Sequence, residues 1–252
     1  LEIGGQTIRL AGMCKGAGMI GPHMATMLAI LTTDAALTPA DAQAVLKAAA
    51  SESFNCISVE GHMSTNDTVL LLASGAASGT EDSGQRTADN PQSAIRNPQL
   101  LAAFQAALTD LSIELARQIP DDGEGASHLI VLDVKGCKTR DDARRIAQTM
   151  ANSALVKTAV SGGDPNWGRI VSAAGYAGVP FDPAAVDLAV NGCTLYERGA
   201  PVPFDAKTVS TSIKSHRETS LVLTLREGPA SIRFWTSDLN ADYVRFNADY
   251  TT

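Results

Sequence analysis

A threonine set in an unusual glycine-rich and methionine-rich stretch is the residue best placed to do covalent chemistry. Thr26 follows Ala25 within residues 15–28, KGAGMIGPHMATML. A threonine hydroxyl alone is a poor nucleophile, but the α-amino group of an N-terminal threonine, with a pKa of about 7.7 to 8.0, can take its proton at neutral pH. Cleavage of the Ala25–Thr26 bond would therefore give one residue both the nucleophile and the base. The alternative is a buried structural threonine before an apolar run.

The glycines of the same stretch raise a rival interpretation. Gly16, Gly18 and Gly21 fit the dinucleotide-binding pattern GxGxxG. A Rossmann unit requires a helix that continues from those glycines, and Pro22 interrupts one, while the apolar residues 26–31 leave no room for a crossover. We therefore interpret the glycines as a tight turn of backbone close to Thr26.

Composition limits the class of protein. The 252 residues include 44% hydrophobic and 19% charged residues, which suits one large soluble domain or two small ones. No run approaches the ~18 apolar residues that cross a bilayer, and residues 1–25 lack a signal-peptide pattern, so we expect no membrane and a cytoplasmic location. A net charge of -7 without clustered Lys and Arg argues against nucleic acid and favours small-molecule partners.

Cysteine and histidine spacing indicates neither a metal site nor a Ser-His-Asp triad. The four cysteines are far apart, with no CxxC pair: Cys14, Cys56, Cys137 and Cys193. We expect reduced structural thiols, with redox or metal roles as the less favoured alternatives. His23, His128 and His216 are expected to be surface or hydrogen-bonded histidines.

The apolar periodicity predicts interleaved helices and strands in an α+β single domain. Helix starts are predicted at Thr38, Asn97, Thr139 and Asp164, the last with Pro165 as its first helical residue. Strands are predicted in a hairpin over residues 1–10 and over residues 26–33, 129–134, 186–190, 220–225 and 231–235. The polar residues 73–98 are predicted to form a surface loop without catalytic residues.

Several motifs together carry a family resemblance. Besides the stretch around Thr26, they are LTTDA at 31–35, STNDT at 64–68, DGEG at 122–125, DPNWGR at 164–169 and NADYTT at 247–252. In this order, the sequence resembles the ornithine acetyltransferase family of arginine biosynthesis from near residue 10 to its last residue. The resemblance implies an αββα layered sandwich. It also implies self-cleavage between Ala25 and Thr26, so that residues 1–25 end an alpha chain and residues 26–252 form the catalytic beta chain.

The resemblance also implies an activity, an N-acyltransferase reaction that needs no cofactor and no metal. Thr26 would take the acetyl group of N-acetylornithine, release ornithine and pass the group to glutamate; acetyl-CoA is a further candidate donor. The implied substrate-binding residues are Lys15, Thr26, Glu124, Asn247 and Thr252. A lysine suits a substrate carboxylate and Glu124 suits the amine of ornithine, whereas the two C-terminal residues can contribute only if the tail folds back.

Other residues and activities stay open at this stage. Arg169 can grip a carboxylate or form a structural pair with Asp164 or Asp67, and residues 64–68 can support the site from behind. His62 stands where some relatives of this kind have an aspartate. The alternatives to acetyl transfer are an N-terminal-nucleophile amidase or peptidase, and a noncatalytic amino-acid-binding fragment.

The resemblance finally predicts partner chains. Members of the family have a long N-terminal half before this point, which contributes a Thr-Gly oxyanion pair, and we expect that missing alpha half as a partner in a heterotetramer of two alpha and two beta chains.

Overall fold

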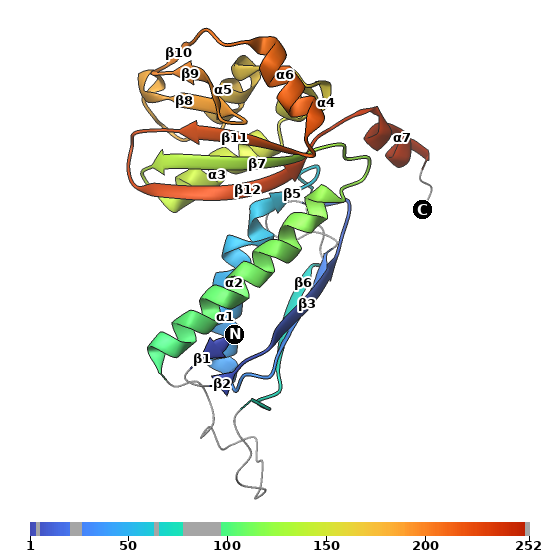
Figure 1. The fold of residues 1–252 in the computed structure, drawn as a ribbon, viewed down its shortest axis with the longest axis vertical. Helices are drawn as coiled ribbons and strands as arrows, with labels where there is room; N and C mark the ends of the chain where they lie inside the picture. The colour runs from blue at the N-terminus through green and yellow to red at the C-terminus, as the bar shows by residue number, and fades with distance from the viewer. Residues whose placement is uncertain (4–5, 21–26, 63–65, 78–96, 250–252) are drawn as a thin grey trace, which may run out of the picture.

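Two sheets, joined by one long helix, organise the chain (Figure 1). The computed structural model describes residues 1–3, 6–20, 27–62, 66–77 and 97–249. Helix α2 (Pro98–Asp121) runs from the small sheet to the large one and packs on β3 of the former and on β5 and β12 of the latter. Residues on both sheets can therefore meet at the C-terminal end of α2.

The small sheet has the strand order β3-β4-β6, with β3 and β4 antiparallel and β4 and β6 parallel. Its strands are β3 (Leu10–Lys15), β4 (Leu28–Thr33) and β6 (Thr68–Ala73). Ala29 and Leu31 on β4 are fully buried, and Leu31 packs in a cluster with residues of α1 (Pro39–Glu52) and α2. One face of this sheet is thus covered by the two helices.

The opposite face of the small sheet is open and apolar. Side chains alternate along a strand, and cross-strand partners share a face, so Met13 of β3 shares its face with Leu70 of β6. Met13, Leu28, Leu70 and Leu72 lie on this face with exposed fractions of 67%, 38%, 43% and 55%. Large apolar side chains gathered on one sheet face indicate a surface that packs against another layer.

The large sheet has the order β10-β9-β8-β11-β7-β12-β5. Its strands are β5 (Ile57–Ser58), β7 (Leu129–Cys137), β8 (Asp187–Val190), β9 (Cys193–Glu197), β10 (Ala200–Pro201), β11 (Glu218–Thr224) and β12 (Ala230–Ser237). The central strand β7 pairs in parallel with β11 and antiparallel with β12, and α3 (Arg140–Ala151) packs on β7 and β12. The remaining elements are β1 (Glu2–Ile3), β2 (Gln6–Thr7), η1 (Phe54–Cys56), α4 (Ala154–Gly162), α5 (Trp167–Gly175), η2 (Pro183–Ala185), α6 (Ala206–Ser215) and α7 (Ala241–Asp249).

Most element predictions are confirmed. Thr38, Asn97 and Thr139 cap α1, α2 and α3, each accepting a hydrogen bond from a backbone N–H of the first turn. The strands over 129–134, 186–190, 220–225 and 231–235 correspond to β7, β8, β11 and β12, and the N-terminal hairpin corresponds to β1 and β2. The α+β class is confirmed. The predicted loop over 73–98 lies mostly outside the described residues, which resume at residue 97.

The helix start predicted at Asp164 and Pro165 is wrong. Helix α5 begins after Asn166, whose side chain accepts the N–H of Arg169 at 3.1 Å. Gly163 ends α4 in the left-handed conformation, at φ 67°, and the next residues form the connection between the helices. Asparagine and aspartate cap helices about equally well, so the local sequence offered two starts and the connection selected the second.

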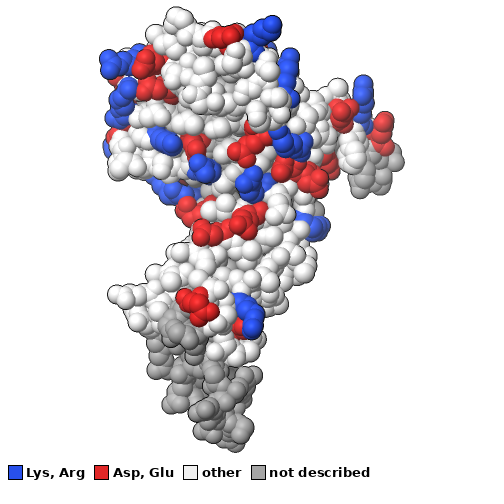
Figure 2. All heavy atoms as spheres, in the orientation of Figure 1, with Lys and Arg blue, Asp and Glu red and all other residues white. Residues whose placement is uncertain are grey.

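Charged side chains are distributed unevenly over the two parts of the fold. In the face drawn in Figure 2, Lys and Arg are interspersed with Asp and Glu over the large-sheet part, whereas the described surface around α1 and α2 carries few charges. Within the described ranges, no helix has both the length and the apolar composition that a membrane span requires.

Candidate active site

The connection between β3 and β4 contains the proposed junction. Lys15 and Leu28, the last and first residues of those strands, lie opposite each other in the ladder. Residues 16–27 join them, so the chain leaves and re-enters the small sheet at one end. Residues 21–26 lie outside the described residues, and this includes Ala25 and Thr26, the predicted cleavage pair. Thr252, predicted to bind substrate, also lies outside them.

Ile20 anchors the chain on the upstream side. Its side chain is 2% exposed, and its N–H donates to Glu60 Oε1 at 2.8 Å. Its carbonyl accepts from the N–H groups of Val59 and Gly61, at 2.8 and 3.3 Å, and from Ser58 Oγ at 3.3 Å. Four hydrogen bonds thus fix one residue to the segment that follows β5.

Met27 anchors the chain on the downstream side. Its N–H donates to Asp67 Oδ1 at 2.7 Å, and its carbonyl accepts the N–H of Thr68 at 3.0 Å. Burial raises the pKa of Asp67, although the Met27 N–H and the charge of Lys15 act in the opposite direction. Within the predicted supporting segment 64–68, Asp67 thus holds the backbone of the residue that follows Thr26.

The two anchoring carboxylates share one feature. Glu60 Oε2 and Asp67 Oδ2 are buried and have no hydrogen-bond partner in the described part of the chain. Burial is also the main cause that raises the pKa of Glu60, with the charge of Glu124 adding to it and the Ile20 N–H, His62 and Lys157 opposing it. One oxygen of each carboxylate accepts a backbone N–H beside the junction, and the other makes no hydrogen bond in the described chain. A buried oxygen without a partner lowers the stability of the fold unless a further group binds it.

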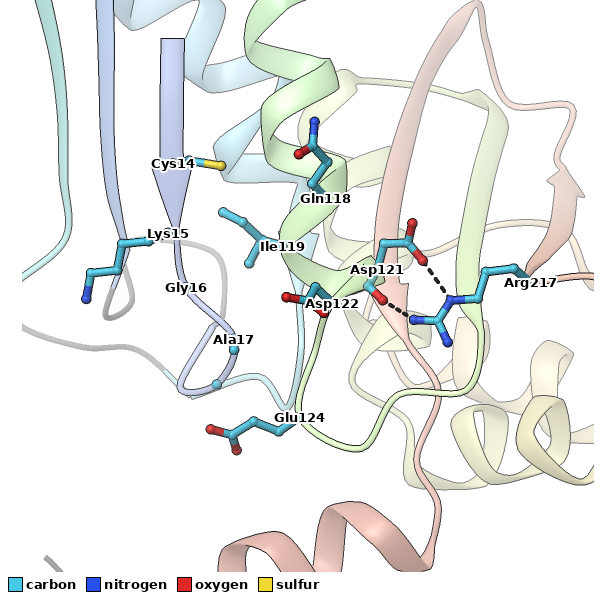
Figure 3. Close-up of a pocket in the computed structure, with 11 residues that line it drawn as sticks. Cys14, Lys15, Gly16, Ala17, Gln118, Ile119, Asp121, Asp122, Glu124 and Arg217 are labelled. Atoms are coloured by element: carbon cyan, nitrogen blue, oxygen red, sulfur yellow. Dashed lines mark hydrogen bonds and ion pairs between the residues drawn. The ribbon is translucent and has the colours of Figure 1, made fainter.

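Lys15 extends onto the open face of the small sheet. Figure 3 shows Cys14 and Lys15 on opposite sides of β3, with the thiol directed toward Gln118 and Ile119 of α2. Cys14 Sγ donates to the carbonyl of Leu115 at 3.3 Å. The ammonium of Lys15 is thus directed away from the helical layer, on the same face as the exposed apolar residues.

Glu124 is positioned by the loop after α2 and by the segment before the junction. Its N–H donates to the carbonyl of Ala17 at 3.1 Å. A Cβ at Gly18 would lie 2.7 Å from the Glu124 carboxylate, so a side chain at this position would displace that carboxylate. In Figure 3, Glu124 and Lys15 both extend toward the left of the view.

The C-terminal helix α7 brings Asn247 to Glu124. Asn247 Nδ2 donates to Glu124 Oε2 at 3.0 Å, across 123 residues of sequence. The helix is held at its start, where Asn240 Nδ2 donates to the carbonyl of Gly125 at 2.7 Å. A Cβ at Gly125 would lie 2.4 Å from the nitrogen of Tyr243, so the loop and the helix are in close contact. The structure therefore brings Glu124 and Asn247 together, as the prediction of a tail that folds back required.

A pocket of about 890 Å³ opens between the end of β3 and the end of α2 (Figure 3). Lys15 and Glu124 line it, together with Cys14, Gly16, Ala17, Gly18, Gln118, Ile119, Asp121, Asp122 and Arg217. Arg217 Nε donates to Asp121 Oδ1 at 2.9 Å, so this cation is already paired. Lys15 lines the pocket at the end of β3 while its ammonium lies on the open face of the small sheet, so a ligand that meets both charges would have to extend around the end of β3 (Figure 3).

Two further expectations, for Arg169 and for a dinucleotide-binding turn, can be compared with the structure. Arg169 contacts neither Asp164 nor Asp67; it donates to the carbonyl of Leu155 at 3.3 Å and to Thr158 Oγ1 at 3.4 Å. The dinucleotide-binding alternative is excluded, because β3 and β4 are antiparallel neighbours and not parallel strands with a crossover helix.

Two of the three described histidines, His128 and His216, make hydrogen-bond contacts. His128 is buried, with Nδ1 3.1 Å from Asp238 Oδ2, and His216 is exposed, with Nδ1 2.8 Å from the carbonyl of Ser212. Both fit the predicted surface or hydrogen-bonded histidines, whereas His23 lies outside the described residues. The four cysteines are unpaired.

Two residues of this region were not predicted from the sequence, Glu60 and the buried Lys157. Glu60 stands alone in a short segment and gives no motif signal. Lys157 does give one, because it interrupts the apolar helix ALVKTAV between the buried Val156 and Val160. A lysine on the buried face of a helix needs hydrogen-bond partners and indicates a polar cluster.

Comparison with known proteins decides the family. The model described as the ArgJ family matches residues 1–252. The chain belongs to the ArgJ family. This confirms the family membership predicted from the motifs around Thr26 and Glu124.

Individual ArgJ relatives are similar over the whole chain. It is 48% identical over 252 residues to the arginine biosynthesis bifunctional protein ArgJ of Rhodopirellula baltica, and 43% identical over 251 residues to that of Parasynechococcus marenigrum. All of the chain is matched in both comparisons, but it spans only 59% and 57% of those relatives.

A solved ArgJ structure has the same fold. The crystal structure of the ArgJ bifunctional protein from Bacillus halodurans superposes with a TM-score of 0.77 at 35% identity, covering 88% of this chain and 98% of that one. The predicted α+β sandwich class is therefore confirmed by an ArgJ structure as well as by the helix-on-sheet layers.

Proposed function

We propose that this chain is the part of an ArgJ enzyme that carries the acyl-accepting nucleophile Thr26, and that it transfers an acetyl group from N-acetylornithine to glutamate. The single observation behind this proposal is the convergence of Lys15, Glu124 and Asn247 around the connection that contains Thr26. The relatives are named as bifunctional proteins of arginine biosynthesis, which supports a reaction in that pathway.

The chemistry begins with cleavage of the Ala25–Thr26 bond. Thr26 Oγ attacks the carbonyl carbon of Ala25, the peptide C–N bond breaks as the nitrogen takes a proton, and water hydrolyses the resulting ester. The products are a carboxylate on Ala25 and a free α-amino group on Thr26. The anchors at Ile20 and Met27 hold both ends during this change, because each is bonded to a different part of the fold.

Acetyl transfer then proceeds in two halves. The Thr26 α-amine takes the proton from Oγ, Oγ attacks the acetyl carbon, and the C–N bond to ornithine breaks as that proton passes to the leaving nitrogen. Acetyl-Thr26 remains, and the amine of glutamate attacks it by the reverse sequence. Glu124, held by Asn247, receives the ammonium of ornithine, and Lys15 faces a carboxylate.

The open face of the small sheet is the proposed docking surface for the N-terminal half. Met13, Leu28, Leu70 and Leu72 expose apolar area there, and Lys15 stands at its edge. A second sheet on this face would complete the αββα layering and enclose Lys15. We propose that the N-terminal half, expected to carry the oxyanion donors, occupies it, within a heterotetramer of two alpha and two beta chains. Acetyl-CoA remains a second candidate donor, and the cytoplasm the proposed location.

The decisive experiment follows the covalent intermediate by intact mass. The protein, supplied with its N-terminal half, is incubated with N-acetylornithine in the absence of glutamate. Two pieces divided between Ala25 and Thr26, with one acetyl group gained on the piece that begins at Thr26, support the proposal. An uncut chain, or a cut chain that hydrolyses the substrate without retaining acetyl, would favour the binding-fragment or amidase alternatives.

A further inference from the structure

Lys157 lies at a point where two strands of the large sheet separate. The parallel strands β5 and β12 pair at Ile57 with Trp235 and at Ser58 with Thr236, and their pairing ends there. The next residues are Val59 and Ser237. Lys157 Nζ donates to the carbonyls of both, at 2.6 Å for Val59, so the ammonium continues the connection where the ladder stops.

Two further oxygens lie within hydrogen-bond distance of the ammonium, which is shielded from water. They are Thr236 Oγ1 at 2.9 Å and Ser237 Oγ at 3.3 Å, so three N–H groups are shared among four oxygens, and the residue is 3% exposed. No carboxylate lies within ion-pair distance of it in the described chain. Four oxygens from two strands therefore surround one buried cation.

Both strands continue directly into the candidate active site. After Val59, Glu60 binds the N–H of Ile20, the upstream anchor of the junction. After Ser237, the chain passes Asp238 and Asn240 into α7, where Asn247 binds Glu124. Tyr243 of α7 lies near both carboxylates, since burial and the charges of Glu60 and Glu124 raise its pKa.

We propose that Lys157 is a positioning residue that holds the ends of β5 and β12 together. It thereby fixes the positions of Glu60 and of α7 relative to Glu124 at the ornithine site. The substrate in this statement rests on the proposed function. The geometry by itself predicts that a change at Lys157 alters the surroundings of Asn247 and Tyr243 in α7, although Lys157 is hydrogen-bonded only to the strand ends in the described chain.

The charge state of Lys157 makes the coupling measurable. Burial lowers its pKa to about 8, against the attraction of Asp238 and Glu60, which are the charged groups facing it. Asp238 is itself bonded to Ser127 and His128, and Glu60 is influenced by His62 and Glu124. Above that pH the amine has two hydrogens for four acceptors, so the tie between the strands weakens.

The first test needs no substrate. In protein labelled with ¹³C at lysine and ¹⁵N at asparagine, the Lys157 side-chain signal and the Asn247 amide signals are followed from pH 6.5 to 9.5. We expect both to shift with one midpoint near 8. In Lys157→Met the Asn247 shift in this range should disappear, whereas Lys47→Met, an exposed lysine on α1, should leave it unchanged. Asn247 signals that ignore the Lys157 titration would overturn the proposal.

The second test measures N-acetylornithine binding by calorimetry at pH 7 and pH 9, with every protein carrying Thr26→Ala so that no acetyl group is transferred. Wild type and Lys47→Met should bind about tenfold more weakly at the higher pH, while Lys157→Met should bind about tenfold more weakly at both, as expected for loss of a bond to a charged group. The difference between the Lys157→Met and Lys47→Met proteins is the decisive quantity. A Lys157→Met protein with wild-type affinity at both values refutes the proposal.

A second variant and the substrate-free signals decide the proposal if Lys157→Met does not fold or if no substrate binds. If Lys157→Met does not fold, Thr236→Val removes one acceptor and leaves the charge, and the Asn247 midpoint should move with that of Lys157; independent midpoints would contradict the coupling. If wild type binds no N-acetylornithine, the proposed function fails, and the signals of Lys157 and Asn247 still decide the positioning role.

Discussion

The two anchors beside the junction differ in how much of the fold supports them. Ile20 is held by four hydrogen bonds from the segment after β5, which belongs to the large sheet, and Lys157 secures that segment in turn. Met27 is held at its N–H by Asp67 alone, and its carbonyl begins the ladder with β6 of the small sheet. Each N–H is held by one carboxylate, but the carbonyl of Ile20 has three donors and that of Met27 has one, so the upstream anchor has more hydrogen bonds.

This difference has a chemical meaning if the chain is cut between the anchors. The upstream piece keeps its place through bonds that do not involve the new terminus. The downstream piece carries Thr26 next to Met27, and its position depends on Asp67, whose second oxygen is buried without a partner in the described chain. We therefore expect cleavage and catalysis to be more sensitive to the Met27 side.

The largest effect should come from the nucleophile itself. Thr26→Ala should leave the chain uncut and abolish acetyl transfer, because neither anchor supplies a nucleophile. Thr32→Ala removes a hydroxyl that is bonded only to the carbonyl of Ala11, at 3.4 Å, and serves as the control, with normal cleavage. Gel analysis and a transfer assay compare them. A Thr26→Ala protein that still cuts itself would remove the junction from the mechanism.

Next in size is the dependence on the layer that we propose covers Met13 and Leu72. Each oxyanion donor is worth about 10² to 10³ in rate, so the chain alone should transfer acetyl groups slower by at least that factor than the chain with its N-terminal half. Titration of the separately expressed half into the assay measures this. Full activity of the chain alone would show that these 252 residues build the oxyanion hole.

A smaller effect, on substrate affinity, is expected for Glu124, the protein carboxylate on the Ile20 side that we propose binds the amine of ornithine. Glu124→Gln keeps the shape and the contact with Asn247 but loses the charge, so N-acetylornithine should bind about tenfold or more weakly. Asp122→Asn, an exposed carboxylate lining the same pocket, is the matched control. Calorimetry on an uncut Thr26→Ala background separates binding from turnover. Equal affinity of the Glu124→Gln and Asp122→Asn proteins would leave Glu124 with a structural role only.

Matched substitutions at the two anchors test their inequality directly. Asp67→Ala removes the only acceptor for the Met27 N–H, and we expect self-cleavage to slow about tenfold, in line with a lost hydrogen bond to a charged group. Ser58→Ala removes one of the two longer contacts to the Ile20 carbonyl, from a hydroxyl that lies closer to Asn152 Oδ1, at 2.6 Å, and should change the rate by about twofold or less. A time course of the uncut precursor after cell-free synthesis gives both rates. A larger effect of Ser58→Ala than of Asp67→Ala on the cleavage rate would contradict the expected greater sensitivity of the Met27 side.

The smallest effect concerns pH and stability at Asp67. Its pKa is raised in the folded state, so the folded protein binds the proton more tightly than the unfolded chain does. The resulting contribution to the free energy of unfolding is therefore present below the ordinary carboxyl pKa and lost as pH rises through the folded value. In the Asp67→Asn protein, the free energy of unfolding should not show this decrease with rising pH. Urea unfolding of both proteins from pH 4.5 to 7 checks it, and identical pH slopes would show that Asp67 is not the source.

Local sequence determined the pieces of this protein. The caps at Thr38, Asn97 and Thr139 act through side-chain bonds that reach only two or three residues, so their position is written in the neighbouring residues. The motifs at Lys15 and Glu124 likewise identified residues that line one pocket. Where two local solutions were of similar energy, as at Asp164 and Asn166, the sequence alone did not decide.

The tertiary structure decided what those pieces do together. Glu60 has no motif, and the apolar helix around Lys157 indicates only that it is buried; the roles of both come from N–H groups and oxygens on segments far away in the sequence. The contact between Asn247 and Glu124 crosses 123 residues and exists only because α7 returns to the end of α2. Short-range bonds can be inferred from a sequence window, whereas a buried charge and its partners are fixed only when the whole chain has packed around them.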